Sequence, residues 1–258
     1  MHPELFSFGP ITLHTYGLFV GIGFLAAILI TMHLGRVYDI EPQQVLDMGF
    51  LMLISAVVGS RLLYVLMNLS YYTRHPLGIL EIWHGGLVFS GGAVCAIGSL
   101  LWYARHHSLS ILDLGDLWAP ATAIGQGFGR IGCFMAGCCY GKPTHVPWAV
   151  VFTNPKSLAP LYIPIHPTEI YHSISGFLLF GILLLVYHKK SYKGQVLFWF
   201  LLLHSFSRLL IERFRGDDRG MFFHTNMTVT QFMAVLILAG SFTALMILKA
   251  RKRKSDKK

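Results

Sequence analysis

The sequence predicts an all-α polytopic membrane protein with seven transmembrane helices, its N-terminus outside and its C-terminus in the cytoplasm. Three observations support this fold class. The 258 residues are 54% hydrophobic and only 13% charged, with a mean hydropathy of +0.56, which is not the composition of a soluble domain. Seven apolar stretches approach the roughly 20 residues that a helix needs to cross a hydrocarbon core. The basic residues are divided unequally between the loops.

The apolar stretches follow one another with short connections. They cover residues from about 12 to 34, 46 to 68, 85 to 103, 117 to 134, 170 to 187, 195 to 211 and 228 to 248. The first has no basic segment before it and no small-residue cleavage pattern after it, so we expect a retained span rather than a removed signal peptide. We therefore expect one transmembrane domain over residues 1–248 and a basic cytoplasmic tail over residues 249–258.

The positive-inside rule sets the orientation of these spans. The N-terminal side holds Arg74, Lys142, Lys156, Arg213, Arg215 and Arg219. The opposite side holds Arg36, Arg105, Lys189, Lys190, Lys193, Lys249, Arg251, Lys252, Arg253, Lys254, Lys257 and Lys258. The more basic side is cytoplasmic, so the net charge of +9 reflects topology and attraction to the lipid surface, and we expect no nucleic-acid partner.

Three arginines, Arg61, Arg130 and Arg208, fall inside spans, where a cation without an anionic partner is costly. Arg130 has no acid nearby in the sequence, and a guanidinium suits phosphate, the common anion of membrane lipids. A structural pair with the distant Glu169 or Glu212 is the alternative. For Arg61, a structural contact with a buried carboxylate or with helix-end carbonyls stands beside a functional role.

Arg208 and Glu212 are four residues apart at the outer end of the sixth span, so they share a helix face and can pair. The alternative to a functional pair is a simple interfacial salt bridge. A dense group of charges follows at the outer surface, namely Arg213, Arg215, Asp217, Asp218 and Arg219. The positive-inside rule disfavours cations there, which favours a functional reason for them.

Two histidine-containing segments open spans. His84 precedes two glycine pairs, Gly85-Gly86 and Gly91-Gly92, which are typical of close packing or of backbone that lines a cavity, and His84 is either a structural or a catalytic residue. The segment from His166 to His172 has Pro167 and a carboxylate early in a helix, as helix starts prefer.

The cysteines favour packing or a disulfide over a metal site. Cys133, Cys138 and Cys139 have C-x4-C-C spacing, unlike the paired C-x2-C units of zinc sites, so we expect no metal. Their position near the oxidising side favours a disulfide or simple thiol packing, and Cys95 is expected in the core. The sequence has no G-x-S-x-G, Walker, H-E-x-x-H or Rossmann pattern, and no cofactor is expected.

Along nearly its whole length the chain resembles the prolipoprotein diacylglyceryl transferases, bacterial enzymes that transfer diacylglyceryl from phosphatidylglycerol to the lipobox cysteine of a prolipoprotein. The resemblance is carried by Tyr16-Gly17, His84-Gly85-Gly86 to Gly91-Gly92, Gly129-Arg130-Ile131-Gly132 through Gly141-Lys142-Pro143, His166-Pro167-Thr168-Glu169-Ile170-Tyr171, and Arg208 with Glu212 and Arg215. The seven-helix, N-out and C-in topology of that family agrees with the charge distribution.

The resemblance implies a multi-pass protein of the bacterial cytoplasmic membrane, with phosphatidylglycerol and prolipoprotein signal peptides as partners. It implies that Tyr16, Arg208 and Glu212 act in catalysis. It also implies that Arg130, Arg208 and Gly141 bind phosphatidylglycerol, with Arg130 as the ligand of its phosphate.

The chain departs from the family pattern at four positions in the expected site. Ser90 replaces a histidine, Cys133 replaces the signature asparagine, and Cys138 replaces the signature acid, while His204 stands where a tyrosine is common. We therefore predict that His84 or His204 supplies the base that Ser90 does not provide.

The departures keep other functions open. One is a divergent relative that uses another acceptor or lipid, and another is a phospholipid-binding or transport protein without catalysis. No repeat relates the two halves of the chain, which disfavours a transporter. A redox role of the cysteines is a further alternative.

Overall fold

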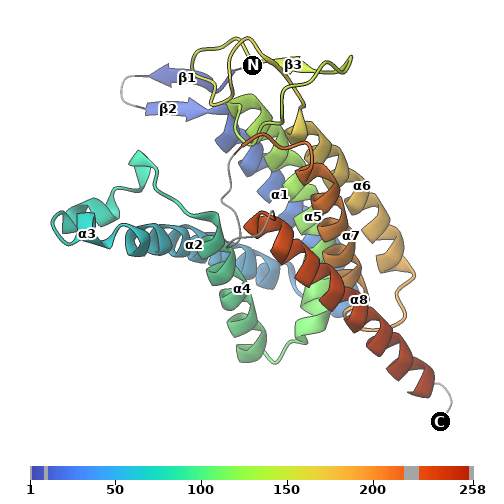
Figure 1. The fold of residues 1–258 in the computed structure, drawn as a ribbon. Coiled ribbons are helices and arrows are strands. Elements are labelled where there is room, and N and C mark those ends of the chain that lie inside the picture. Colours follow the sequence, from blue (N-terminus) through green and yellow to red (C-terminus); the bar gives the residue numbers. More distant parts are fainter. Residues whose placement is uncertain (1, 9–10, 218–226, 256–258) are drawn as a thin grey trace. The chain divides into compact units, whose positions relative to one another are not determined.

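The computed structural model describes residues 2–8, 11–217 and 227–255 of the chain (Figure 1). The helices are α1 (Thr15–Gly35), α2 (Pro42–Met67), α3 (Leu69–Tyr72), α4 (Phe89–His106), α5 (Ile111–Ala136), α6 (Thr168–His188), α7 (Gln195–Glu212) and α8 (Val229–Ser255). Short 3-10 helices cover Arg36–Tyr38, Pro76–Leu80 and Ile82–His84, and the strands are β1 (Glu4–Phe8), β2 (Ile11–His14), β3 (Val150–Val151) and β4 (Pro164–Ile165). The mainly helical prediction is confirmed.

Five helices of the described residues are long and apolar enough to cross a membrane. They cover Thr15–Tyr38, Pro42–Met67, Thr168–His188, Gln195–Glu212 and Val229–Lys254. The other two expected spans are helices as well, α4 and α5, but their composition is less apolar. The protein is therefore a membrane protein, while the number of seven spans and their orientation stay predictions.

The chain divides into two compact units. Unit 1 comprises Met1–Thr31 and Gly115–Lys258, and unit 2 comprises Met32–Leu114. Each unit is described by itself below.

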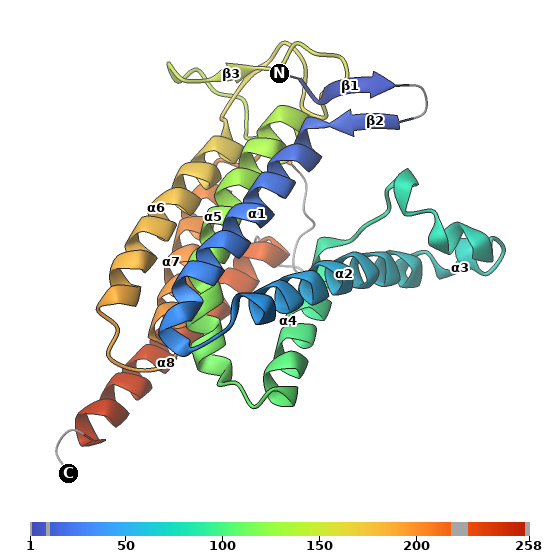
Figure 2. The same cartoon turned by 180° about the vertical axis from the view of Figure 1, so that it is seen from behind.

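Small residues let the helices of unit 1 approach each other closely. Helices α5, α6 and α7 run side by side in both views (Figures 1 and 2). A Cβ on Gly176 of α6 would lie 2.9 Å from the backbone nitrogen of Gly127 in α5, and Ser173 donates a 2.9 Å hydrogen bond to the Gly127 carbonyl. A Cβ on Gly132 would lie 3.1 Å from the carbonyl oxygen of Tyr16 in α1. Close backbone contact of this kind is the usual way that membrane helices associate.

A buried carboxylate joins α5 to the beginning of α7. Asp116 is fully buried and accepts hydrogen bonds from the backbone nitrogens of Gly194 (2.8 Å) and Leu197 (2.9 Å). Lys190 pairs with the same carboxylate at 3.2 Å. These contacts satisfy backbone donors that a helix start leaves open, so they fix where α7 begins.

Two small hairpins lie at the end of unit 1 where α5 finishes and α6 begins (Figure 2). Strands β1 and β2 pair antiparallel, and so do β3 and β4. Phe152 and Ile165 are almost fully buried beneath the second hairpin, with Phe134 of α5 packed against them. The sequence analysis did not predict these strands, because each is too short to show a hydrophobic period.

In unit 2, the second glycine pair, Gly91-Gly92, serves close packing between α2 and α4. A Cβ on Gly91 would collide with the backbone of Gly59, and a Cβ on Gly92 would lie 2.8 Å from the carbonyl oxygen of Ala56. This confirms that the second glycine pair marks close packing.

Arg61 is the polar centre of unit 2, and its structural interpretation is confirmed. The buried guanidinium donates hydrogen bonds to five carbonyl oxygens, those of Gly78 (2.6 Å), Ile79 (2.9 Å), Glu81 (3.3 Å), Gly85 (2.8 Å) and Gly86 (3.2 Å). The planar fork of donors holds the segment between α3 and α4, whose own regular structure is limited to two short 3-10 helices.

We expect Arg61→Lys to loosen this segment, because an ammonium group offers three donors in place of five. Each hydrogen bond to a charged donor contributes about 1.5–3 kcal/mol, so the loss of two predicts amide exchange over residues 76–88 that is roughly a hundredfold faster. Hydrogen exchange read by mass spectrometry measures the change. Arg105→Lys, at an exposed position of α4, is the control. Unchanged exchange in Arg61→Lys would mean that the fork does not hold the segment.

Candidate functional site

Unit 1 contains most of the residues that the sequence singled out. These are Tyr16 in α1, Arg130 in α5, Gly141 after α5, and His204, Arg208 and Glu212 in α7. His84 belongs to unit 2, at the end of a short 3-10 helix, and its side chain lies outside the described part of the structure. Ser90 is exposed in the first turn of α4, also in unit 2. The candidate site is therefore built here from unit 1.

One face of α7 carries a histidine, an arginine and a carboxylate at four-residue spacing. Arg208 Nε lies 3.3 Å from Glu212 Oε2, and the two side chains are 12% and 3% exposed. The predicted pair is thus confirmed, and it is too buried to be a simple surface bridge. His204, one turn earlier, stacks on Phe200 with ring centroids 5.5 Å apart and lies within electrostatic range of Arg208 and Arg130.

The start of α8 completes the surroundings of Glu212. Thr230 Oγ1 donates a 2.8 Å hydrogen bond to Glu212 Oε1, and Thr228 Oγ1 lies 3.4 Å from the same atom. One carboxylate oxygen therefore faces Arg208 while the other is held by hydroxyl groups. The sequence analysis missed both threonines, because nothing in a linear pattern brings the start of α8 to the end of α7.

Arg215 is a third cation at this end of unit 1. Its side chain is 3% exposed, its Nε and Nη2 bind the two oxygens of Asp217 at 2.8 and 2.7 Å, and its Nε lies 4.0 Å from Glu212 Oε2. Burial disfavours its charge, but hydrogen bonds with Asp217 and Cys139 outweigh burial and raise the pKa of Arg215. The sequence placed it in the outer charge group and among the residues that carry the family resemblance, and its spacing from Glu212 is a signal for contact.

Gly141 acts through its backbone. Its N–H donates a 3.1 Å hydrogen bond to the His166 carbonyl, and it pairs antiparallel with Arg215. A Cβ would collide with the His166 carbonyl and lie 2.8 Å from that of Phe214, so no other residue fits without displacing backbone. Gly141 thus joins the segments that follow α5, precede α6 and follow α7. Its direct contact with lipid stays a prediction.

Arg130 differs from Arg208 and Arg215 because it has no partner among the residues that the structure describes. It is half-buried near the end of α5, and among residues 2–8, 11–217 and 227–255 its side chain makes no ion pair or hydrogen bond. The alternative pairs with Glu169 and Glu212 are not formed there. Tyr16 and His172 lie within electrostatic range of the guanidinium. A half-buried guanidinium with free donors can bind an anion that the protein does not supply.

The first turns of α6 add two buried polar side chains that the sequence placed only at a helix start. Helix α6 does begin at Thr168, directly after Pro167. Glu169 is fully buried, and within the described parts of the chain neither carboxylate oxygen has a hydrogen-bond partner. His172, one turn later, is 7% exposed, and its Nε2 also lacks a partner there. Unsatisfied buried groups of this kind are rare and mark sites of function.

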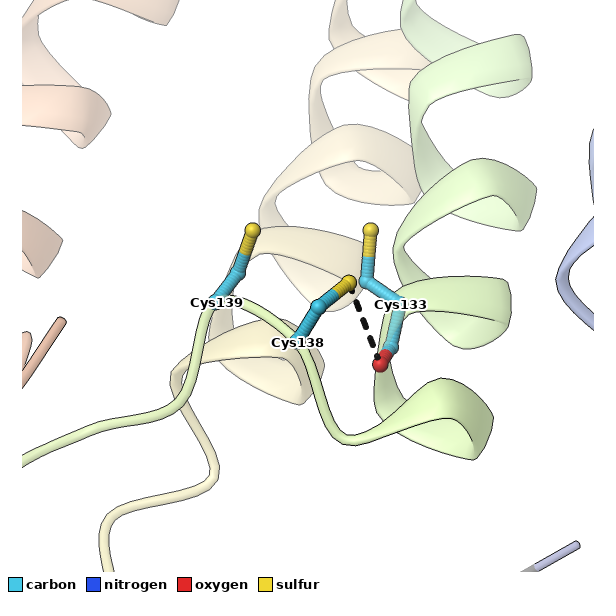
Figure 3. Close-up of side chains that lie close together, drawn as sticks. All are labelled: Cys133, Cys138 and Cys139. Carbon is cyan, nitrogen blue, oxygen red and sulfur yellow. Dashed lines mark hydrogen bonds between the residues drawn. The ribbon is translucent and has the colours of Figure 1, made fainter. Parts of the chain in front are cut away.

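The three signature cysteines converge at the end of α5. Gly137, with a φ of +74°, ends the helix in a Schellman motif: its N–H bonds to the Phe134 carbonyl and the Cys138 N–H bonds to the Cys133 carbonyl. This motif places the Cys138 side chain beside Cys133 (Figure 3). The Sγ atoms of Cys133, Cys138 and Cys139 all lie within 4.8 Å of one another.

None of the four cysteines, all of them among the described residues, forms a disulfide, so of the two expected alternatives the disulfide is not present. The neighbouring Cys133 and Cys138 thiols, together with the Arg215 guanidinium, lower the pKa of Cys139. Thr168 Oγ1 donates a 2.8 Å hydrogen bond to the Cys139 carbonyl oxygen, which connects the turn to α6. The cysteine cluster is therefore part of the same end of unit 1 as the arginines.

The arrangement can bind a phosphate ester beside a thiol. Arg130 has free donors, Arg208 is oriented by Glu212, and Tyr16 and His204 lie near the same cations. Fixed guanidinium groups stabilise the negative charge that develops on a leaving phosphate.

Comparisons with known proteins show the family of the chain. The sequence profile described as prolipoprotein diacylglyceryl transferase matches residues 3–247. The phosphatidylglycerol--prolipoprotein diacylglyceryl transferase of Clostridium tetani is 33% identical over 246 residues, which cover 94% of this chain and 96% of that protein. The enzyme of the same name from Geobacter sulfurreducens is 34% identical, covering 84% and 83% of the two chains. The chain thus belongs to the prolipoprotein diacylglyceryl transferase family.

Proposed function

We propose that the protein transfers the diacylglyceryl group of phosphatidylglycerol to the lipobox cysteine of prolipoproteins, forming a thioether and releasing glycerol phosphate. The observation that carries this proposal is Arg130, a half-buried cation with no partner within the described ranges, on the unit that also holds the ion pair of Arg208 and Glu212. The names of the relatives supply the substrate and the acceptor.

The chemistry requires a thiolate nucleophile and a stabilised leaving group. The sulfur of the acceptor attacks the glyceryl carbon that bears the phosphate ester, the C–O bond breaks, and glycerol phosphate leaves with the bonding electrons. Arg130 and Arg208 hold the phosphate as its charge increases, and Glu212 orients Arg208 through the 3.3 Å ion pair. Tyr16 and Gly141 complete the site, Gly141 by shaping the backbone at the phosphatidylglycerol headgroup.

We infer that the protein spans the bacterial cytoplasmic membrane seven times, with the site near the outer surface. The unequal distribution of basic loops supports this orientation. Helices α4 and α5 would be the two less apolar spans, and α5 is less apolar because it carries Asp113, Asp116 and the functional Arg130. Such intramembrane charges are costly and are retained for function.

The direct test uses purified protein, phosphatidylglycerol and a lipobox peptide. Glycerol phosphate release together with a mass increase of one diacylglyceryl group on the peptide is expected. Release without peptide modification would instead support a relative with another acceptor, the candidate that the departures at Ser90, Cys133 and Cys138 favour. If neither product forms while labelled phosphatidylglycerol is bound, the protein is a phospholipid-binding member without catalysis.

The base that receives the acceptor proton is assigned to His84 or His204. We expect the double variant His84→Gln/His204→Gln to lose at least about a hundredfold in the rate of lipidation, the range that general base catalysis contributes. His33→Gln/His145→Gln, which changes two exposed histidines, is the matched control. Lipidation by the first variant at the wild-type rate would exclude both residues as the base.

A further inference from the structure

The cysteine cluster, defined as Cys133, Cys138 and Cys139, has the geometry of a three-ligand metal site. Zinc binds thiolate sulfur at about 2.3 Å, which places tetrahedral ligands about 3.8 Å apart. The three Sγ atoms already lie within 4.8 Å of one another, so rotation of the side chains suffices to reach that spacing. Figure 3 shows the sulfurs of Cys133 and Cys139 on the same side of the turn, with Cys138 directed toward Cys133.

The backbone fixes this convergence before any ion binds. The Schellman motif joins Cys138 to Cys133, Cys139 adopts a φ of +69° that a residue with a side chain rarely takes, and Thr168 holds its carbonyl. Simple packing of small thiols would not require a strained backbone at Cys139. A preformed cluster of soft ligands is instead suited to a soft cation.

The surroundings of the cluster match the charge of such a centre. Three thiolates and one divalent zinc ion carry a net negative charge, and the guanidinium groups of Arg130 and Arg215 lie within electrostatic range of Cys139. Glu169, a fully buried carboxylate without a hydrogen-bond partner among the described residues, is also within electrostatic range of Cys139. The two guanidinium groups, and not Glu169, therefore balance the net negative charge of such a centre.

We propose that Cys133, Cys138 and Cys139 bind one zinc ion and leave its fourth position open for the thiol of the acceptor. Three protein ligands with one open position are the arrangement of catalytic rather than structural zinc. The role of the fourth position rests on the proposed transferase function, whereas the binding of zinc does not.

The open position would activate the acceptor for the proposed transfer. The acceptor thiol releases its proton to the base or to water when its sulfur binds zinc, because a coordinated thiol is deprotonated. The sulfur then forms a bond to the glyceryl carbon, the carbon–oxygen bond breaks, and the electron pair leaves with the phosphate that the arginines hold. Zinc is neither oxidised nor reduced in this step.

The first test measures metal in the full-length protein purified in detergent. We expect about one zinc ion per chain in the wild type. In Cys133→Ser, Cys138→Ser and Cys139→Ser, we expect the zinc content per chain to fall at least about tenfold. Cys95→Ser is the matched control, since Cys95 lies in α4 of the other unit, and it should retain the ion. Replacement of zinc by cobalt should give sulfur-to-cobalt charge-transfer absorption in the wild type and in Cys95→Ser, and none in the three variants of the cluster.

Two results would overturn the zinc site. One is a wild-type protein that contains no zinc and shows no cobalt absorption although its thiols react as free. The other is a disulfide within the cluster, found by mass spectrometry of the protein isolated without reductant.

The second test separates this inference from the proposed function. Removal of zinc by a chelator should abolish transfer to the peptide, and added zinc should restore it. If the cysteines bind zinc but the protein transfers the diacylglyceryl group at the full rate after zinc is removed, the role of the fourth position is wrong and the zinc site itself stands. Cysteine-dependent zinc binding in a protein that modifies no peptide in any metal state would remove the transferase proposal and leave the metal site standing.

Discussion

Replacing Arg130 by Gln is expected to lower diacylglyceryl transfer by at least about a thousandfold, while the protein still inserts into the membrane. The guanidinium has no ion pair or hydrogen bond within the described residues, so its removal breaks no polar contact there. It would, however, remove the cation that offsets charge on the leaving phosphate. Arginines that contact a transferring phosphoryl group contribute about 10³ to 10⁵ in rate, which sets the expected size.

The measurement is the rate of peptide lipidation by equal amounts of membrane-inserted protein. Arg36→Gln, which neutralises an exposed arginine outside the site, should retain the wild-type rate. Thermal unfolding in detergent checks that Arg130→Gln is as stable as the wild type. Normal transfer by Arg130→Gln would remove phosphate binding by this residue from the mechanism.

The sequence predicted the long helices well, because their apolar runs are long. The expected span at 195 to 211 corresponds to α7 at Gln195–Glu212, and the first, fifth and seventh spans differ from α1, α6 and α8 mainly at their ends. Helix α4 begins at Phe89 rather than near 85 because Gly85 and Gly86 have φ values of +84° and +72°, which no helix accommodates. Helix α5 begins at Ile111, six residues early, since polar residues at its start hide it from an apolar window.

Within the site, the sequence predicts contacts between residues one helical turn apart, but it does not predict contacts between segments that are distant in the chain. Arg208 and Glu212 pair because four residues make one helical turn, which can be read from the sequence. The cysteine spacing predicts no metal site, which stays a prediction, but it does not show that the Schellman turn at Gly137 brings the three Sγ atoms within 4.8 Å of one another. The five carbonyl partners of Arg61 come from a segment 17 to 25 residues away, a contact that no periodicity encodes.

Replacing Glu212 by Gln is expected to reduce transfer by about a hundredfold or more through the loss of order at two arginines. The carboxylate lies 3.3 Å from Arg208 Nε and 4.0 Å from Arg215 Nε, with all three side chains largely buried. Removing one partner of a buried pair costs about 3–5 kcal/mol, so the fold should lose stability as well. The neutral amide keeps the size of the side chain and can still accept the Thr230 hydrogen bond, which confines the change to the charge.

The comparison that isolates this charge uses two further variants. Glu41→Gln makes the same chemical change at an exposed helix start and should leave transfer unchanged. Glu212→Asp retains the charge on a shorter side chain and should recover part of the rate, which loss of fold stability alone does not explain. Because Glu212 acts on the phosphate through Arg208, the loss should appear in the maximal rate more than in the concentration of phosphatidylglycerol needed for half-saturation. If only the concentration of phosphatidylglycerol needed for half-saturation changes, the pair binds the lipid headgroup equally in the ground state and in the transition state. Glu212 would then determine affinity for the lipid rather than the rate of the reaction.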